Sequence, residues 1–398
     1  MSPGKAQRVA VLGATGSIGC STLDVIAGWP DKFQVVALSA GGNVERLQGQ
    51  AERFRPELLA VRSAEAAAAL RDRLAGSGYQ PRIVSGPDGL LAAATECGAD
   101  IVVAAVVGVV ALEAIAASLR AGYRVALANK EALVVAGELL RAAARAGGGT
   151  IVPVDSEHSA VHQCLRSGER GELARLILTA SGGPFRNFTA AELARVTPAQ
   201  ALRHPTWSMG NRVTLDSATL MNKGFEILEA CQLFQLEESQ VDVLVHPQSI
   251  VHSMVEFVDG AVIAQLSTTD MRTPIQYALS YPRRLRSARL PLKLEEVGKL
   301  EFFLPDSQRF PCLGLAREAG RAGGGAGAVL NAADEIALEA FVAGKVEFCA
   351  IARIVEATLQ RMGAPALESI GAVLELDDKA RKVAQEEVAA LGTRAHRA

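Results

Sequence analysis

The first 150 residues alternate short apolar runs with longer segments in which apolar residues recur at helical spacing. The apolar runs bounded by turn residues predict strands, and the segments between them predict amphipathic helices. Strict alternation of strand and helix is typical of an α/β fold with a doubly wound parallel sheet. The expected strands cover residues 8–12, 33–39, 58–61, 82–84, 100–106, 123–128 and 150–154.

The pattern changes after residue 150. Apolar runs at 174–181 and 241–247 predict two further strands, and residues 252–258 and 261–267 flank Asp259-Gly260, which is a hairpin signal. We therefore expect a second, partly antiparallel sheet in a central α+β domain over residues 151–285.

The last part of the chain has a third character. Residues 286–311 are interrupted by prolines and only weakly periodic, so they predict a linker. Residues 312–398 are rich in Ala, Glu and Leu at helical spacing, which predicts a C-terminal helical bundle. The expected organisation is a domain over 1–150, a central domain over 151–285, the linker and the bundle.

Composition excludes several classes of protein. Of 398 residues 49% are hydrophobic, enough for a large core, and 41 basic against 43 acidic residues give a net charge of −2. This balance argues against a nucleic-acid partner or a polybasic membrane binder. The longest apolar run, 101–112, has about half the ~20 residues of a membrane span. Six scattered cysteines without a CxxC pair fit reduced thiols in a cytoplasmic protein and no zinc site.

A glycine-rich turn follows the first expected strand. Gly13, Gly16 and Gly19 lie between that strand and a helix, where glycines let the backbone approach a pyrophosphate and the helix N-terminus supplies donors. This context predicts a dinucleotide site and a Rossmann-like domain, although a glycine-rich turn without a ligand is the alternative. The residues that would line the turn are Thr15, Gly16, Ser17 and Ile18.

The end of the second expected strand bears on the choice of dinucleotide. NADH sites usually carry an acid there for the ribose 2′-hydroxyl, but residues 40–43 contain none. The absence removes a repulsion against a 2′-phosphate, and Arg46 is near enough in sequence to help, so NADPH is favoured. The alternative is that this loop contacts no ribose.

Two acids follow the last expected strand of the first domain. Asp155 and Glu157 are two residues apart, so they would point to the same side of an extended segment, and no Lys or Arg accompanies them locally. Converging carboxylates favour a hard cation such as Mg²⁺ or Mn²⁺. Glu226, on a probable helix with Asn222 and Lys223, is the expected third ligand. A helix cap at Asp155 is an equally strong interpretation.

Other polar residues suggest a site for an anion. Ser181 and two glycines follow a strand, and residues 203–223 are dense in polar side chains. His204 and Trp207 suggest a mobile flap. Taken singly, each has a plainer explanation: a helix C-cap for His204, surface packing for Trp207 and a helix N-cap for Ser217.

Two further groups of polar residues have both a functional and a structural interpretation. Lys130 and Glu131 follow a strand at the edge where doubly wound sheets bind ligands, or they simply begin a helix. His246 and His252 have no acid or cysteine at ligand spacing, so we assign them to sheet structure.

Six motifs in order, "GATGSIG", "NKE", "VDSEH", "ASGGPF", "HPTWSMG" and "LDSATLMNKGFE", closely resemble the 1-deoxy-D-xylulose 5-phosphate reductoisomerase family over essentially the whole chain. The resemblance implies a homodimeric, NADPH- and divalent-metal-dependent enzyme of non-mevalonate isoprenoid biosynthesis. It would rearrange and reduce 1-deoxy-D-xylulose 5-phosphate to 2-C-methyl-D-erythritol 4-phosphate.

The resemblance also implies residue roles. Gly42 departs from the family, whose members often carry a basic residue there that meets the 2′-phosphate. Lys130, Asp155, Glu157, Glu226 and His204 would be catalytic. NADPH would be bound by Thr15, Gly16, Ser17, Ile18, Gly41, Gly42, Asn43, Asn129, Glu131 and Gly210, and Mg²⁺, Mn²⁺ or Co²⁺ by Asp155, Glu157 and Glu226. The substrate would be bound by Lys130, Ser156, Glu157, Ser181, His204, Trp207, Ser217, Asn222, Lys223 and Glu226.

Two other functions compete. A different NADP-linked oxidoreductase, such as a semialdehyde dehydrogenase, would need a nucleophilic cysteine, and Cys164 inside an expected helix is a poor candidate. A non-enzymatic dinucleotide sensor would explain the glycine turn but would have no use for the three acids.

Overall fold

The computed structural model describes residues 6–203, 210–286 and 291–395, and the chain divides into two compact units. The first contains the described residues up to Ala132, Glu138–Ser159 and a segment that begins at Asp270. The second contains Leu133–Gly137, Ala160–Thr269 and the described residues after Pro291. The division falls inside the helices α6 (Lys130–Gly147) and α7 (Ser156–Cys164), so each of these continuous helices has residues in both units.

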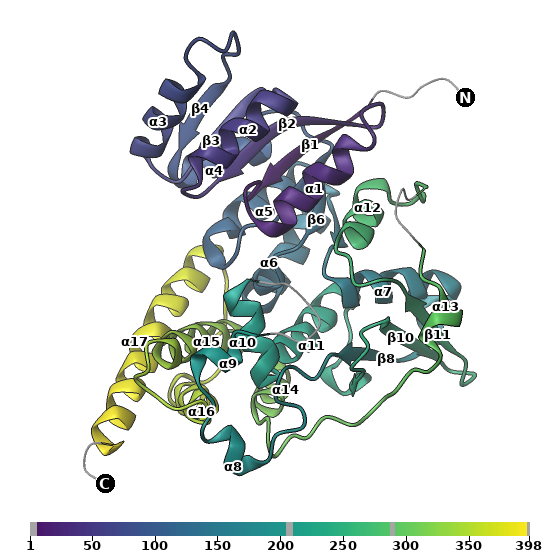
Figure 1. Ribbon diagram of the computed structural model, residues 1–398, viewed down its shortest axis with the longest axis vertical. Coiled ribbons are helices and arrows are strands. Elements are labelled where there is room, and N and C mark those ends of the chain that lie inside the picture. Colours follow the sequence, from purple (N-terminus) through teal and green to yellow (C-terminus); the bar gives the residue numbers. More distant parts are fainter. Residues whose placement is uncertain (1–5, 204–209, 287–290, 396–398) are drawn as a thin grey trace. The chain divides into compact units, whose positions relative to one another are not determined.

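The first unit is built on a parallel sheet of seven strands in the order β4-β3-β2-β1-β5-β6-β7 (Figure 1). The chain builds outward from β1 to β4 and then continues from β5 on the other side of β1, which is the order of a doubly wound sheet. This confirms the expected fold class. The strands are β1 (Gln7–Leu12), β2 (Phe33–Ala40), β3 (Leu58–Val61), β4 (Arg82–Ser85), β5 (Ile101–Ala104), β6 (Arg124–Leu127) and β7 (Thr150–Pro153).

Helices cover both faces of this sheet, which is why inner strands such as β3 and β5 are continuous apolar runs. Buried side chains of α1, α2, α3 and α12 pack in one apolar cluster with β1 and β2, whereas those of α4 and α5 pack in another. The helices are α1 (Ser17–Ala27), α2 (Val44–Phe54), α3 (Ala64–Leu74), α4 (Gly86–Thr95), η1 (Val109–Ala111), α5 (Leu112–Arg120) and α12 (Arg272–Ser280).

The second unit holds a four-stranded sheet in the order β11-β10-β8-β9. β10 and β11 form the expected hairpin, in which the Asp259 side chain accepts a hydrogen bond from the Ala261 N–H at 2.9 Å, and β8 and β9 are parallel. The expectation of a partly antiparallel second sheet is confirmed. The strands are β8 (Leu173–Ala180), β9 (Val241–Val245), β10 (Val251–Phe257) and β11 (Val262–Leu266).

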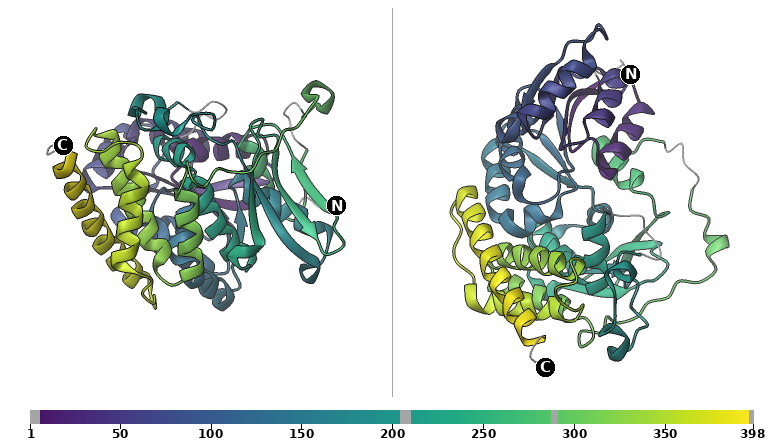
Figure 2. Two further views of the ribbon diagram at one scale, coloured as in Figure 1. Left: turned by 90° about the horizontal axis from the view of Figure 1, so that it is seen from below. Right: turned by 60° about the vertical axis from the view of Figure 1, so that its left-hand side comes forward.

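The C-terminal helices pack around α15, which lies against α14, α16 and α17 (green to yellow in Figure 2). The expected linker contains the short helix α13 and a bridge between Val245 and Phe303. The remaining helices are η2 (Leu165–Ser167), η3 (Arg170–Glu172), α8 (Ala190–Leu193), α9 (Pro198–Ala201), α10 (Asn211–Thr219), α11 (Met221–Phe234), η4 (Glu238–Gln240), α13 (Leu294–Val297), α14 (Cys312–Ala322), α15 (Ala326–Val342), α16 (Ala350–Met362) and α17 (Ile370–Ala395).

Charged side chains anchor α10 to the C-terminal helices. Arg212 on α10 forms an ion pair with Glu335 on α15 and donates to the Asn331 side chain at 2.6 Å. Arg381 on α17 pairs with the same Glu335 and with Asp377 at 2.6 Å. Because these partners are largely buried, their hydrogen bonds hold α10 in a defined place against α15 and, through Glu335, α17.

In the described part of the chain, no helix combines the length and the apolar character that crossing a membrane requires.

Candidate active site

The glycine turn brings backbones into close contact. Gly13 has φ +82°, and a Cβ there would lie 2.4 Å from the Ala105 carbonyl oxygen, while a Cβ at Gly19 would lie 2.3 Å from the Gly13 oxygen. Only glycine fits such approaches. α1 begins at Ser17, directly after Gly16, and the first N–H groups of a helix have no partner within it. The turn therefore presents donors at a helix N-terminus, as an anion site needs.

The loop after β2 lies beside this turn. Asn43 caps α2 by accepting a hydrogen bond from the Arg46 N–H at 3.0 Å. The Arg46 guanidinium donates to the Thr15 carbonyl oxygen at 3.0 Å. Gly41 and Gly42 are exposed. Arg46 thus contacts predicted cofactor residues of both loops, Asn43 through its backbone N–H and Thr15 through its side chain.

Asn129 has a structural task that the sequence did not reveal. Its Nδ2 donates to the carbonyl oxygens of Val106 at 2.6 Å and Gly108 at 2.8 Å, and its Oδ1 accepts from the Ala132 N–H at 3.0 Å. The side chain therefore ties the start of α6 to the loop after β5. Glu131, in the first turn of α6, is buried.

Asp155 and Glu157 do not lie on an extended segment. α7 begins at Ser156, and the Asp155 carbonyl oxygen accepts from the Ser159 N–H at 2.8 Å, so Glu157 is in the first turn of a helix. The expectation that they share one side of a strand is wrong because the chain turns into α7 directly after Asp155. The Ser156 hydroxyl donates to the Glu157 carboxylate at 2.6 Å.

A lysine accompanies these acids after all. Lys130 Nζ lies 2.5 Å from Asp155 Oδ2, and the two side chains are only 12% and 11% exposed. The local stretch gave no sign of this pair, because Lys130 follows β6 whereas Asp155 follows β7. The two strands are parallel neighbours with Leu127 in register with Pro153, so the residues after their carboxyl ends meet.

The predicted face of α11 also forms. Asn222 Nδ2 donates to Glu226 Oε1 at 2.6 Å, and Lys223 Nζ forms an ion pair with the other carboxylate oxygen. Lys223 and Glu226 are 3% and 1% exposed, so each depends on its partners for compensation of the buried charge. Glu226 is thereby held in one orientation.

The three acids converge. One oxygen each of Asp155, Glu157 and Glu226 lies within 4.8 Å of the other two. Carboxylate oxygens are the ligands that Mg²⁺ and Mn²⁺ prefer. The donor set therefore fits a hard divalent cation. Two of the three carboxylates also pair with a lysine, Asp155 with Lys130 and Glu226 with Lys223.

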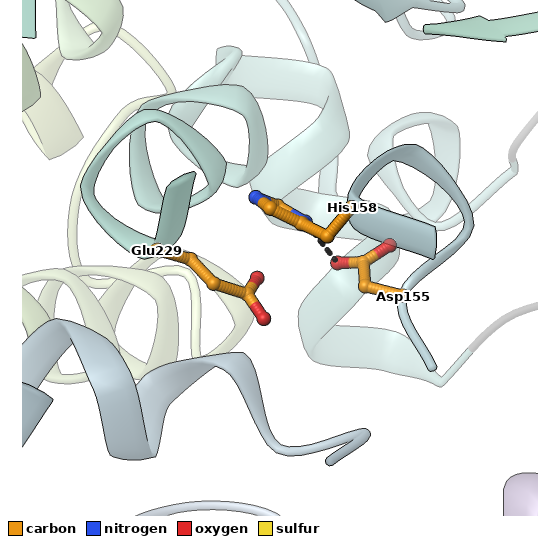
Figure 3. A group of neighbouring side chains, drawn as sticks. All are labelled: Asp155, His158 and Glu229. Carbon is orange, nitrogen blue, oxygen red and sulfur yellow. Dashed lines mark ion pairs between the residues drawn. The ribbon is translucent and has the colours of Figure 1, made fainter. Parts of the chain in front are cut away.

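A second group that sequence reasoning missed shares Asp155. Single ligand atoms of Asp155, His158 and Glu229 lie within 4.8 Å of one another, and both His158 and Glu229 are fully buried (Figure 3). His158 Nδ1 lies 3.9 Å from Asp155 Oδ2. The available signal was helical spacing, because His158 lies three residues after Asp155 and Glu229 three residues after Glu226.

Two of the candidate phosphate residues, Ser181 and Ser217, come from a loop and a helix that touch. Ser181 follows β8, and its Oγ accepts from the Gly183 N–H at 3.2 Å. Gly183 has φ +67°, and a Cβ there would lie 2.4 Å from the Ser217 carbonyl oxygen. The Ser217 hydroxyl donates within α10 to Val213 at 2.7 Å. The loop of Ser181 and the end of α10 are therefore packed together, next to the start of α11.

The expected flap residues His204 and Trp207 lie outside the described residues. Gly210, the first residue described after that gap, is the N-cap of α10 and is exposed.

His246 and His252 are both buried. His246 Nδ1 lies 2.8 Å from the Glu301 carbonyl oxygen, and its ring stacks on Phe302. Burial lowers the pKa of His252 on β10 to about 4, so this imidazole is neutral at neutral pH.

Cys164 is a poor nucleophile in the structure as well. It is buried at the end of α7, and burial raises the pKa of its thiol to about 11. A thiol with a raised pKa is largely protonated and unreactive at neutral pH. This argues against the dehydrogenase alternative that needs a catalytic cysteine.

Comparison with known proteins covers nearly the whole chain. Three family models match the chain. The model of 1-deoxy-D-xylulose 5-phosphate reductoisomerase matches residues 9–137, and the model of its C-terminal domain matches residues 151–234. A further model, the DXP reductoisomerase C-terminal domain, matches residues 266–383. Enzymes of that name from Moorella thermoacetica and Solibacter usitatus are 51% and 50% identical, over 95% and 96% of this chain and 97% of each relative.

Solved structures agree. The Zymomonas mobilis reductoisomerase in complex with NADPH is 44% identical with a TM-score of 0.91, covering 96% of this chain and 99% of that one. A reductoisomerase in complex with NADPH, fosmidomycin and magnesium is 41% identical with a TM-score of 0.91, covering 97% and 99%.

Proposed function

The chain belongs to the 1-deoxy-D-xylulose 5-phosphate reductoisomerase family, and from this premise we propose which of its residues perform the family's reaction. The protein is an NADPH- and divalent-metal-dependent oxidoreductase that converts 1-deoxy-D-xylulose 5-phosphate into 2-C-methyl-D-erythritol 4-phosphate. The observation that carries the assignment of residues is the convergence of Asp155, Glu157 and Glu226 within 4.8 Å. A dinucleotide sensor would have no use for that arrangement.

We propose that these three carboxylates hold Mg²⁺, Mn²⁺ or Co²⁺. The cation supplies Lewis-acid stabilisation of negative charge on a substrate oxygen. Lys130 adds a positive charge next to Asp155 and would move a proton at the sugar or stabilise its developing charge. Ser156, which donates to Glu157, orients that carboxylate and offers a polar contact to the substrate.

The phosphate end of the substrate is assigned to Ser181, Ser217, Asn222 and Lys223. The packing of Gly183 against Ser217 supports this, because it brings the loop of Ser181 next to the end of α10 that carries Ser217. Lys223 is buried, so its charge would strengthen a nearby anion contact more than a solvated lysine would. His204 and Trp207 are proposed to close over the bound sugar and exclude water.

NADPH supplies the hydride for the reduction step. We propose that the glycine turn binds its pyrophosphate, since that turn presents the N-terminus of α1. The full set of proposed cofactor residues is Thr15, Gly16, Ser17, Ile18, Gly41, Gly42, Asn43, Asn129, Glu131 and Gly210. For Asn129 the contact would come from its backbone, because its side chain already makes three hydrogen bonds.

The decisive experiment removes the metal. Protein stripped with a chelator is mixed with NADPH and 1-deoxy-D-xylulose 5-phosphate, and NADPH absorbance is followed before and after Mg²⁺ or Mn²⁺ is added. Oxidation is expected only after the metal is added, because without a cation the three carboxylates repel each other and no Lewis acid is present.

The same protein without substrate should not oxidise NADPH, which controls for contaminating activity. If the protein is folded and binds NADPH but stays inactive with every metal, the reductoisomerase assignment is wrong and the sensor hypothesis is favoured. If oxidation proceeds equally without metal, the three-acid site is wrong.

We also propose a homodimer, in line with the family resemblance. β11 lies at the edge of the second sheet and exposes Val262 (47%) and Ile263 (36%). An exposed apolar edge strand is a template for pairing with a second copy. Light scattering is expected to give twice 41.7 kDa for the native protein and to fall toward 41.7 kDa for Val262→Lys. A monomeric native protein would contradict the proposal.

The division of labour along the chain is proposed as well. Residues 1–150 would bind NADPH, residues 151–285 would hold metal and substrate and form the dimer contact, and residues 312–398 would support them as a helical bundle after a linker over 286–311. The six free cysteines support a reducing, cytoplasmic environment; recovery of the native enzyme with the membrane or secreted fraction would contradict this location.

A further inference from the structure

An arginine from the third strand reaches the loop after the second. β2 and β3 are parallel neighbours with Ala40 in register with Val61, so the next residues of both strands leave the same edge of the sheet. The Arg62 N–H donates to the Gly41 carbonyl oxygen at 3.4 Å, and its guanidinium nitrogen Nη2 lies 3.5 Å from where a Cβ at Gly42 would be. The head of Arg62 therefore lies over Gly42.

This loop is where a doubly wound sheet meets the adenosine ribose of a dinucleotide. An acid after the second strand binds the two ribose hydroxyls of NADH, whereas an arginine nearby accommodates a 2′-phosphate. Residues 41–43 are Gly, Gly and Asn, so the loop contributes neither an acid nor a base of its own. A charged side chain that contacts the 2′ position of the adenosine ribose therefore has to come from a neighbouring element.

Two arginines are near enough to be considered, and they differ in what they already bind. Arg46 donates to the Thr15 carbonyl oxygen, which commits one of its nitrogens to holding the glycine turn. Arg62 is exposed, and its guanidinium has no hydrogen bond or ion pair with the residues that the structure describes. A free guanidinium offers a planar fork of donors that matches a phosphate group.

We propose that Arg62 binds the 2′-phosphate of NADPH and thereby sets the preference of this enzyme for NADPH over NADH. The inference rests on the proposed function and adds a specificity residue to it. Gly42 lies next to this guanidinium, because a Cβ at that position would be in ordinary van der Waals contact with Arg62 Nη2, 3.5 Å away.

The test is the affinity of purified protein for NADPH and NADH, measured by calorimetry without substrate. Arg62→Ala is expected to raise the dissociation constant for NADPH by about 10- to 100-fold, the effect of losing a hydrogen-bonded charge, and to change that for NADH by less than about twofold. Initial rates measured with each dinucleotide should show the same effect: in Arg62→Ala, kcat/KM for NADPH divided by kcat/KM for NADH should fall.

Arg120→Ala is the matched control. It removes the same charge from the same unit, at an exposed position on α5 where Arg120 pairs with Glu113. This variant is expected to leave the ratio of the two dissociation constants unchanged, so a shift in that ratio for Arg62→Ala is not an effect of net charge.

A rescue variant sharpens the test. Gly42 does not have a positive φ, and the atom nearest to a Cβ there belongs to Arg62 itself, so Gly42→Lys fits once Arg62 is truncated. Adding Gly42→Lys to Arg62→Ala is expected to restore at least about a third of the lost selectivity, expressed as free energy, through a single charge–phosphate contact.

Each outcome decides something. An equal loss of affinity for both dinucleotides would mean that Arg62 only shapes the loop, and an unchanged NADPH affinity would mean that it contacts no phosphate; either overturns the inference and leaves the proposed function standing. If the native protein binds neither dinucleotide, the proposed function itself is wrong.

Discussion

Glu226→Gln is expected to lower turnover by about a hundred- to a thousandfold while the affinity for NADPH stays unchanged. The change keeps the size of the side chain but removes the charge that a divalent cation needs from this ligand. It also removes the carboxylate of the buried ion pair between Glu226 and Lys223. Initial rates of NADPH oxidation over a range of Mg²⁺ and Mn²⁺ concentrations measure the effect, and the variant should need more metal than the native enzyme.

Glu318→Gln, at an exposed position on α14, is the control for loss of one negative charge and should be fully active. Thermal unfolding of Glu226→Gln separates a damaged site from a damaged fold, since breaking a buried ion pair is destabilising. If Glu226→Gln does not fold, the half-buried Glu157→Gln replaces it. Near-normal turnover of a folded Glu226→Gln or Glu157→Gln at ordinary Mg²⁺ concentrations would disprove the three-acid site.

Lys130→Met should lower turnover by about a hundredfold or more, the usual contribution of a positioned acid or base. Lys130 Nζ lies 2.5 Å from Asp155 Oδ2, and methionine keeps the length of the side chain without its charge. Removal of a cation next to the carboxylates also removes a repulsion against a bound divalent ion. The variant should therefore lose turnover without needing more metal, which titration with Mn²⁺ would show.

That combination distinguishes two roles for Lys130. If Lys130→Met needs much more metal than the native enzyme, the lysine serves mainly to hold Asp155 in place, and the assignment to proton transfer or charge stabilisation is wrong. Lys130→Arg is the control, because it keeps a positive charge and should retain the metal requirement of the native enzyme while its different geometry lowers turnover.

Local pattern was sufficient for most of the fold. Each of the seven apolar runs expected in residues 1–150 is a strand of the first sheet. Strands inside the sheet, such as β3 and β5, are apolar because they are buried on both faces. The hairpin at Asp259-Gly260 was equally predictable, since the preference for a tight turn depends on these two residues alone. The glycine turn and the α11 face with Asn222 and Glu226 were also predictable, as both depend on spacing within one segment.

The pairings between segments were not predictable in the same way. Asp155 was expected either on an extended segment or as a helix cap, in both cases without a basic neighbour; it lies directly before α7 and pairs with Lys130. The order of β6 and β7 in the sheet brings these residues together, and neither local stretch encodes that order. His158 and Glu229 were missed for a related reason: burial, which makes a histidine and an acid noteworthy, is not visible in a short polar stretch.

The sequence by itself therefore determined the elements, the class of the fold and, through six ordered motifs, the family and its chemistry. Only the tertiary structure decided which charges meet: Lys130 with Asp155 and the head of Arg62 with the Gly42 loop. The physical reason is that helix and strand periodicity act over a few residues, whereas a contact across neighbouring strands depends on the order and register of the whole sheet.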